Sequence, residues 1–259
     1  MNSKDPIGLF DSGIGGTSIW KEVRALLPNE NTIYLADSKN APYGLKSKEE
    51  IIFLSEKNTE ILLEQNCKLI VVACNTATTN AIKELRAKYK VPFIGIEPAI
   101  KPAALQSKTQ TIGILATKGT LNSALFHENV AKHPEVKIVE QIGHGLVQLI
   151  ENDAIASEEM TELLKSYLLP MVEKNIDYLV LGCSHYPYLI PQIKKIIPAK
   201  IKIIDSGEAV AKQTKKILEE RDLLNVSNST PTSLFYTNSS KDVLQKILSP
   251  IDTIFYKNF

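Results

Sequence analysis

Two cysteines in this sequence occupy matching positions, each at the end of an apolar run. Cys74 follows residues 69–73, Cys183 follows residues 178–182, and polar residues come directly after each thiol. Such a run is typical of a buried parallel strand, and ligands of open α/β sheets bind beyond the carboxyl ends of the strands. A thiolate can act as a base where neighbouring donors and dipoles lower its pKa. The pair therefore indicates one site with a sulfur on each side, suited to removing a proton from one face of a carbon and returning one to the other face.

Other polar residues near these strand ends could assist the two thiols. Asp11 lies at the tip of the first apolar strand, and His185 comes two residues after Cys183. Each could orient or deprotonate its cysteine. Helix N-termini after Asn75 and Ser184 would help to hold a thiolate.

Other uses of cysteine fit the sequence less well. Cys67 lacks comparable polar neighbours and is interpreted as a small buried hydrophobe. A zinc site needs three or four ligands, and no C-x-x-C or H-x-x-x-H spacing occurs, so we expect no metal. A hydrolase that used Cys183 with His185 would leave Cys74 without a role. A thiol-based binding or redox module stays open as a function of a different class.

A glycine-rich turn at residues 11–17 follows the first strand and opens a helix. Its glycines, Gly13, Gly15 and Gly16, do not have the G-x-G-x-x-G spacing of a dinucleotide site. Glycines let the backbone approach a ligand closely, and a helix N-terminus offers N–H groups to an anion. The turn therefore suits a carboxylate-binding or acid/base loop better than a dinucleotide site.

The elements that must position these residues recur along the chain. The strand at 111–116 echoes the strand at 7–10, Cys183 echoes Cys74, and the strand ending at Asp205 echoes the one ending at Glu97, all at offsets of 105 to 109 residues. One nearly constant offset indicates a duplicated α/β unit. Alternating strands and helices in each half predict a mainly parallel sheet flanked by helices. We expect two similar domains related by a pseudo-two-fold axis, with the active site in the cleft between them.

The domain boundaries follow from this repeat. Residues 1–97 together with 207–259 are expected to form the first domain, which carries Cys74, and residues 98–206 the second, which carries Cys183. After position 207 a helix, a strand at 233–237, a further helix and a strand at 253–256 are expected as edge elements of one sheet.

The composition excludes several classes of function. The chain has 259 residues, of which 44% are hydrophobic and 23% charged, and a net charge of +1 gives no basic footprint for nucleic acid. No apolar run approaches the roughly 18 residues that a membrane helix needs, and no signal-peptide core is present. We therefore expect a cytoplasmic protein with neither a nucleic-acid nor a membrane partner, whose three cysteines are free thiols.

Five short motifs together carry a resemblance to a known family. They are Phe10–Gly16 (FDSGIGG), Ala41–Gly44 (APYG), Ala73–Ala77 (ACNTA), Gly95–Pro98 (GIEP) and Gly182–Pro187 (GCSHYP). With these motifs the chain resembles the aspartate/glutamate racemase family, and within it the glutamate racemases. The resemblance implies cofactor-independent interconversion of L- and D-glutamate by two cysteine bases, with D-glutamate supplied for peptidoglycan synthesis. It also implies a bacterial cytoplasmic location and a homodimer.

The resemblance also implies roles for individual residues. Cys74 would act on the D-enantiomer and Cys183 on the L-enantiomer, with Asp11 and His185 as further catalytic residues. Hydroxyls, amides and backbone N–H groups should clamp the carboxylates and the ammonium of the substrate. The substrate contacts implied are Asp11, Ser12, Pro42, Tyr43, Gly44, Asn75, Thr76, Thr117, Ser184 and His185.

The sequence departs from the family pattern at two places. Threonine usually follows the second cysteine, whereas this chain has Ser184, which retains the hydroxyl, so we expect the contact to survive. Residues 141–151 do not match the family's Cys-Pro-rich segment except at Glu151, a possible helper of His185. A racemase for aspartate or another acidic substrate is the nearest alternative.

Overall fold

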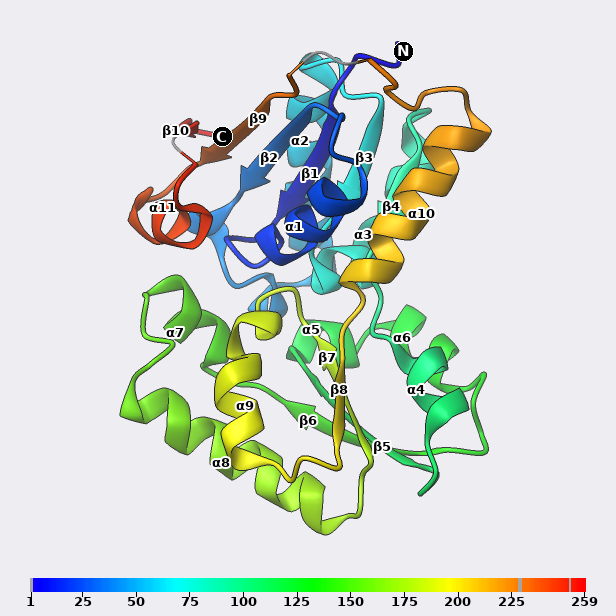
Figure 1. Cartoon of the computed structure of the whole chain (residues 1–259), viewed down its shortest axis with the longest axis vertical. Helices are drawn as coiled ribbons and strands as arrows, with labels where there is room; N and C mark the ends of the chain where they lie inside the picture. The colour runs from blue at the N-terminus through cyan, green and yellow to red at the C-terminus, as the bar shows by residue number, and fades with distance from the viewer. Residues whose placement is uncertain (1, 228–229, 252) are drawn as a thin grey trace.

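Two parallel sheets, each in its own lobe, form the computed structural model (Figure 1), which describes residues 2–227, 230–251 and 253–259. The prediction of an α/β fold with two similar, helix-flanked parallel sheets is confirmed. Parts of the domain prediction fall on Met1, Asn228, Ser229 and Asp252, which lie outside the described residues. Among the described residues, no helix combines the length and the apolar character needed to cross a membrane.

The first sheet has the strand order β10-β9-β2-β1-β3-β4, with parallel pairing throughout. Its last two strands in sequence extend it beyond β2, so the predicted edge elements are confirmed. The strands are β1 (Ile7–Asp11), β2 (Thr32–Ala36), β3 (Leu69–Val72), β4 (Phe93–Gly95), β9 (Ser233–Thr237) and β10 (Ile254–Tyr256). The helices of this lobe are α1 (Thr17–Leu26), η1 (Ser38–Asn40), η2 (Tyr43–Leu45), α2 (Lys48–Glu64), α3 (Asn75–Lys88), α10 (Gly207–Glu220) and α11 (Asp242–Leu248).

The second sheet repeats the topology of the first. Its order, β6-β5-β7-β8, matches β2-β1-β3-β4, so β5 takes the place of β1 and β7 that of β3. The strands are β5 (Thr111–Ala116), β6 (Lys137–Ile142), β7 (Tyr178–Gly182) and β8 (Lys202–Ile204). The helices are α4 (Ile100–Gln106), α5 (Lys118–Leu121), α6 (Ala124–Val130), α7 (Leu146–Glu151), α8 (Glu158–Glu173), η3 (Tyr186–Leu189) and α9 (Ile190–Ile196).

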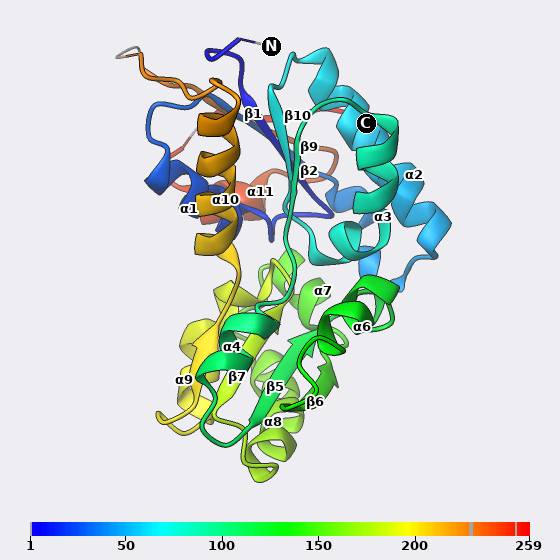
Figure 2. The ribbon, with the colours of Figure 1, turned by 90° about the vertical axis from the view of Figure 1, so that its right-hand side faces the viewer.

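Helices on both faces explain why the strands of the first sheet read as continuous apolar runs. All four residues of β3 are buried, and neighbouring residues point into two different core clusters, one with α1 and α10 and one with α2 and α3 (Figure 2). Helix α2 begins with a capping box: the Ser47 hydroxyl accepts from the backbone N–H of Glu50, and the Glu50 carboxylate accepts from the backbone N–H of Ser47.

The chain crosses between the lobes after β4 and again between β8 and α10 (Figures 1 and 2). The two crossings touch, because the Ser206 hydroxyl donates to the carbonyl of Glu97. Strands of the first sheet therefore come from both ends of the chain and those of the second from its middle. This arrangement supports the division that we propose from the sequence, at 97/98 and at 206/207.

Candidate active site

Cys74 lies at the carboxyl end of the β3 segment, as the N-cap residue of α3. Its sulfur accepts from the backbone N–H of Ala77 at 3.4 Å, and its thiol faces the Ser12 hydroxyl at 3.7 Å. Ser12 comes from the turn after β1, the neighbouring strand. Free N–H groups and the helix dipole favour a negative charge at this position, so the fold provides uncharged support for a thiolate.

Burial dominates the electrostatics of Cys74, whose side chain is almost completely enclosed. Burial raises the pKa of the Cys74 thiol, and the Asp11 carboxylate adds to the rise. The Ala77 N–H and the Ser12 hydroxyl act in the opposite direction. The Cys183 sulfur also raises the pKa of Cys74, because the two thiols lie close enough to interact.

Cys183 follows β7, the strand that corresponds to β3, but its surroundings differ. A 3-10 turn, η3, comes next with His185 as its N-cap residue, and α9 begins only at Ile190, so the predicted helix N-terminus after Ser184 is that of a 3-10 turn and not of an α-helix. A continuous α-helix would need a hydrogen bond from residue 191 to the carbonyl of Pro187, and Pro191 has no N–H to donate. A side chain takes the place of the helix: Nδ1 of His185 lies 3.9 Å from the Cys183 sulfur.

His185 is buried and paired with a carboxylate. Its Nε2 lies 2.6 Å from Oε1 of Glu151, which also accepts from the backbone N–H of Ile14, while Oε2 accepts from the Ser38 hydroxyl. Burial lowers the pKa of His185, but Cys183, Glu151 and Asp11 outweigh it and hold that pKa well above its usual range. The raised pKa favours the protonated imidazolium, which would place a positive charge beside the Cys183 sulfur.

Asp11 bridges the two lobes. Its Oδ1 accepts from the Ser184 hydroxyl at 3.0 Å, and its Oδ2 accepts from the backbone N–H groups of Gly13 and Gly16 at 3.1 Å. Burial raises the pKa of Asp11, and the charge of His185, 4.0 Å away, opposes the rise. The carboxylate thus contacts the residues beside Cys183, whereas Ser12 contacts Cys74.

Three threonines meet across the boundary between the lobes. The Thr76 hydroxyl lies 2.8 Å from that of Thr117 and 3.3 Å from that of Thr120. Thr120 was not expected from the sequence, although a capping pattern marks it, since the Thr117 side chain accepts from its N–H. Next to Thr76, the side-chain oxygen of Asn75 is buried and has no hydrogen-bond partner among the residues that the structure describes. Both lobes therefore contribute hydroxyl and amide groups beside Cys74.

The turn at residues 41–45 covers this group. Pro42 and Gly44 line a small cavity of about 90 Å³ with residues of the second lobe that include Thr117 and His144. Gly44 packs so closely that an added Cβ would lie 2.8 Å from Cβ of Thr117. Tyr43 is buried in the same core cluster as Cys74, and its hydroxyl donates to Asp37.

The structure thus gathers the predicted site residues at the carboxyl ends of corresponding strands of the two sheets. Cys67 lies elsewhere in the first lobe, near Gly8, and burial raises its pKa to about 12. Sequence reasoning missed Ser38, whose hydroxyl helps to hold Glu151. A lone serine in a turn carries no signal that would reveal so distant a partner.

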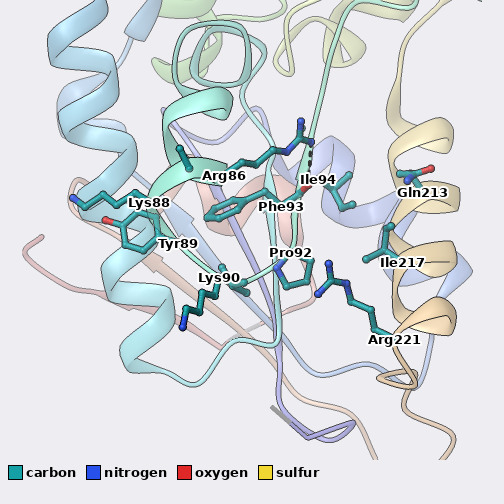
Figure 3. A pocket seen from close by; sticks show the side chains of 13 residues that line it. Arg86, Lys88, Tyr89, Lys90, Pro92, Phe93, Ile94, Gln213, Ile217 and Arg221 are labelled. Atoms are coloured by element: carbon teal, nitrogen blue, oxygen red, sulfur yellow. Dashed lines mark hydrogen bonds between the residues drawn. The ribbon is translucent and has the colours of Figure 1, made fainter.

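A separate cavity of about 680 Å³ lies near the amino end of β4, between the end of α3 and α10 (Figure 3). Arg86, Lys90 and Arg221 line it, and Arg86 donates to the carbonyl of Phe93 at 3.1 Å. None of the three cysteines lines this cavity. It is therefore distinct from the site formed at the carboxyl ends of the strands.

Comparison with known proteins agrees with the resemblance noted in the motifs. Residues 17–214 match the family described as Asp/Glu/Hydantoin racemase. A glutamate racemase of Herpetosiphon aurantiacus is 44% identical over 243 residues, which cover 93% of this chain and 96% of that protein. The crystal structure of glutamate racemase from Francisella tularensis in complex with D-glutamate has a TM-score of 0.86 and 30% identity, and covers 98% of each chain. That of Escherichia coli glutamate racemase in complex with L-glutamate and activator UDP-MurNAc-ala has a TM-score of 0.87 and 32% identity, and covers 97% of each chain.

Proposed function

Because the chain belongs to the Asp/Glu/hydantoin racemase family, and within it to the glutamate racemases, we propose that it interconverts L- and D-glutamate by proton transfer between two cysteines. The observation that carries this proposal is the equivalent placement of Cys74 and Cys183 after β3 and β7, close enough for one thiol to influence the other. The chemistry needs no cofactor.

The proposed reaction has two half-steps. In the L-to-D direction the Cys183 thiolate takes the α-proton, and the electron pair of the C–H bond delocalises into the α-carboxylate. The Cys74 thiol then gives its proton to the opposite face of the α-carbon, so Cys183 ends as a thiol and Cys74 as a thiolate. The D-to-L direction reverses each step. Donors aimed at the carboxylate stabilise the charge that develops there.

The two bases are supported by different means. We assign to His185 and Glu151 the support of a Cys183 thiolate, through the imidazolium beside that sulfur. For Cys74 the N-terminus of α3 and the Ser12 hydroxyl serve the same purpose. Asp11 ties the glycine-rich turn to Ser184 and so maintains the spacing between the two sides.

The remaining predicted contacts suit the charged groups of glutamate. The unpartnered Asn75 oxygen can accept from the substrate ammonium, and the hydroxyls of Thr76 and Thr117 can donate to a carboxylate. The exposed fraction is 4% for Cys74 and 6% for Cys183, so the lobes must separate to admit substrate and close again. The contact between Ser206 and Glu97 joins the two crossings about which such a motion would occur.

Three wider assignments belong to the same proposal. The D-glutamate would supply peptidoglycan synthesis, an assignment supported by the muramyl nucleotide named as activator of the E. coli protein. We also propose that the protein is located in a bacterial cytoplasm and forms a homodimer. Size-exclusion chromatography coupled to light scattering would test the homodimer by measuring the mass in solution.

The function is tested with L-glutamate in deuterated water. We expect optical rotation to decay to zero while deuterium enters the α-position, and the rate with aspartate to be much lower. Folded enzyme that leaves the rotation unchanged would rule out the assignment. Faster turnover of aspartate would instead establish the nearest alternative.

A further inference from the structure

The loop between β2 and α2, residues 37–47, has its own system of support. It descends from the first sheet to the boundary between the lobes (Figure 1) and carries the predicted substrate contacts Pro42, Tyr43 and Gly44. Gly44 lies against Thr117 of the second lobe. The position of this loop therefore decides how the turn at 41–45 sits over the site.

The Tyr43 hydroxyl is engaged within the protein. It donates to Oδ2 of Asp37 at 2.5 Å and accepts from the Asn58 amide at 3.1 Å. Burial raises the pKa of Tyr43 well above its usual range, and Asp37 adds to the rise, so the hydroxyl remains a donor. The side chain of Tyr43 thus fixes the turn from within, which leaves backbone groups of the turn for substrate.

Asn238 forms hydrogen bonds with the same loop through both ends of its side-chain amide. Its amide nitrogen donates to Oδ1 of Asp37 at 2.5 Å, and its amide oxygen accepts from the backbone N–H of Lys39 at 2.9 Å. Asn238 follows β9, which pairs with β2, and is itself buried. In the second sheet, β6, the counterpart of β2, is an edge strand, so within the described residues only the first lobe has this support.

We propose that Asn238 and Asp37 are positioning residues, which hold the turn at 41–45 over Cys74 through hydrogen bonds that run from Asn238 to Asp37 to Tyr43. The additional strand β9 then serves substrate binding as well as the sheet. This inference rests on the proposed function, since it takes glutamate as the molecule bound under the turn. The hydrogen bonds from Asn238 to Asp37 to Tyr43 would thus contribute to the affinity for glutamate, while the two thiols carry out the proton transfer.

Steady-state kinetics of Asn238→Ala test the inference. We expect KM for glutamate to rise about tenfold and kcat to change less than about threefold, because two hydrogen bonds to the loop are lost while both sulfurs keep their surroundings. Tyr43→Phe keeps the ring and should raise KM by a smaller factor. Asn225→Ala is the control, since Asn225 is also buried and its side chain makes two hydrogen bonds, to Asn29 and Ser227, away from the loop. Asn238 makes one hydrogen bond more, to the carbonyl of Phe259.

Hydrogen exchange separates positioning from general stability. In Asn238→Ala, peptides within 37–47 should exchange faster, while those over β5 and β7 keep their protection. A fall in kcat at unchanged KM, or an equal rise of KM in Asn225→Ala, would overturn the inference. Wild-type activity on glutamate is measured in the same series. Absence of this activity would contradict the proposed function, whereas hydrogen exchange in residues 37–47 would still test the hydrogen bonds of Asn238 and Asp37.

Discussion

The two halves of this molecule deliver a thiol in the same way and surround it differently. Strands β3 and β7 hold corresponding places in the four-strand order that the two sheets share, and a cysteine follows each. Cys74 caps a helix of 14 residues and receives uncharged donors. Cys183 precedes a 3-10 turn and receives a histidine that is paired with a carboxylate.

This difference shows which part of a duplicated architecture is shared and which is not. The backbone path fixes where each sulfur lies, because strand order and register repeat. The means of supporting a thiolate depends on a few side chains after the strand, and these differ between the halves. Two equal geometries can therefore support their thiols by different chemical means.

Replacing either thiol gives the largest expected effect. Cys74→Ser and Cys183→Ser should each lower racemisation by more than about a thousandfold, because a serine hydroxyl is a far weaker base than a thiolate and each face needs its own. The measurement is loss of optical rotation, with exchange of the α-proton followed separately, since one remaining thiol can still exchange at its own face. Cys67→Ser is the control and should retain activity. Full racemisation by either site variant would end the two-base interpretation.

Removing the carboxylate behind His185 should affect only the Cys183 side. Glu151→Gln is expected to lower kcat about ten- to a hundredfold, because the imidazolium loses its charged partner. The direction of the pH dependence of kcat follows from the raised pKa of His185. The imidazolium is present below this pKa and is lost as the pH rises through it. Without Glu151 the pKa falls, so the alkaline decline of kcat should begin at lower pH.

A matched control for this charge is Glu158→Gln, at the exposed start of α8. It removes a carboxylate of the second lobe far from the histidine and should leave the pH profile of kcat in place. An unchanged profile in Glu151→Gln as well would mean that the two sides do not differ as the structure indicates.

Much of the fold could be predicted from sequence because its signals are local or periodic. The apolar runs before Cys74 and Cys183 predict buried strands, Ser47 and Glu50 predict a helix start, and the constant offset predicts the repeated topology. What the sequence could not show are contacts between distant segments. Nothing near Asp11 indicates that its carboxylate meets Ser184, 173 positions later.

The supporting residues were harder to predict than the thiols for a further reason. Asp37 lies in a turn, where aspartate is common for purely local reasons, so its sequence context is equally consistent with a plain loop. Its contact with Asn238 becomes visible only when the pairing of β9 with β2 brings Asn238 beside it. Glu151 meets Ile14 only when the two lobes come together, whereas its partner His185 belongs to the same lobe.

The smallest expected effect concerns Ser184, the residue after the second cysteine. Its substitution tests how strongly kcat/KM depends on the Ser184 hydroxyl. Ser184→Thr keeps the donor to Asp11 and should change kcat/KM by less than about threefold. Ser184→Ala leaves Asp11 buried with one donor fewer, and a lost hydrogen bond of about 1 kcal/mol corresponds to about a fivefold fall in kcat/KM. The ratio between the two variants is informative because both keep His185 and Cys183. Wild-type activity in both variants would show that Gly13, Gly16 and His185 suffice to hold Asp11. A Thr variant as impaired as an impaired Ala variant would instead show that side-chain shape, and not the hydroxyl, decides at this position.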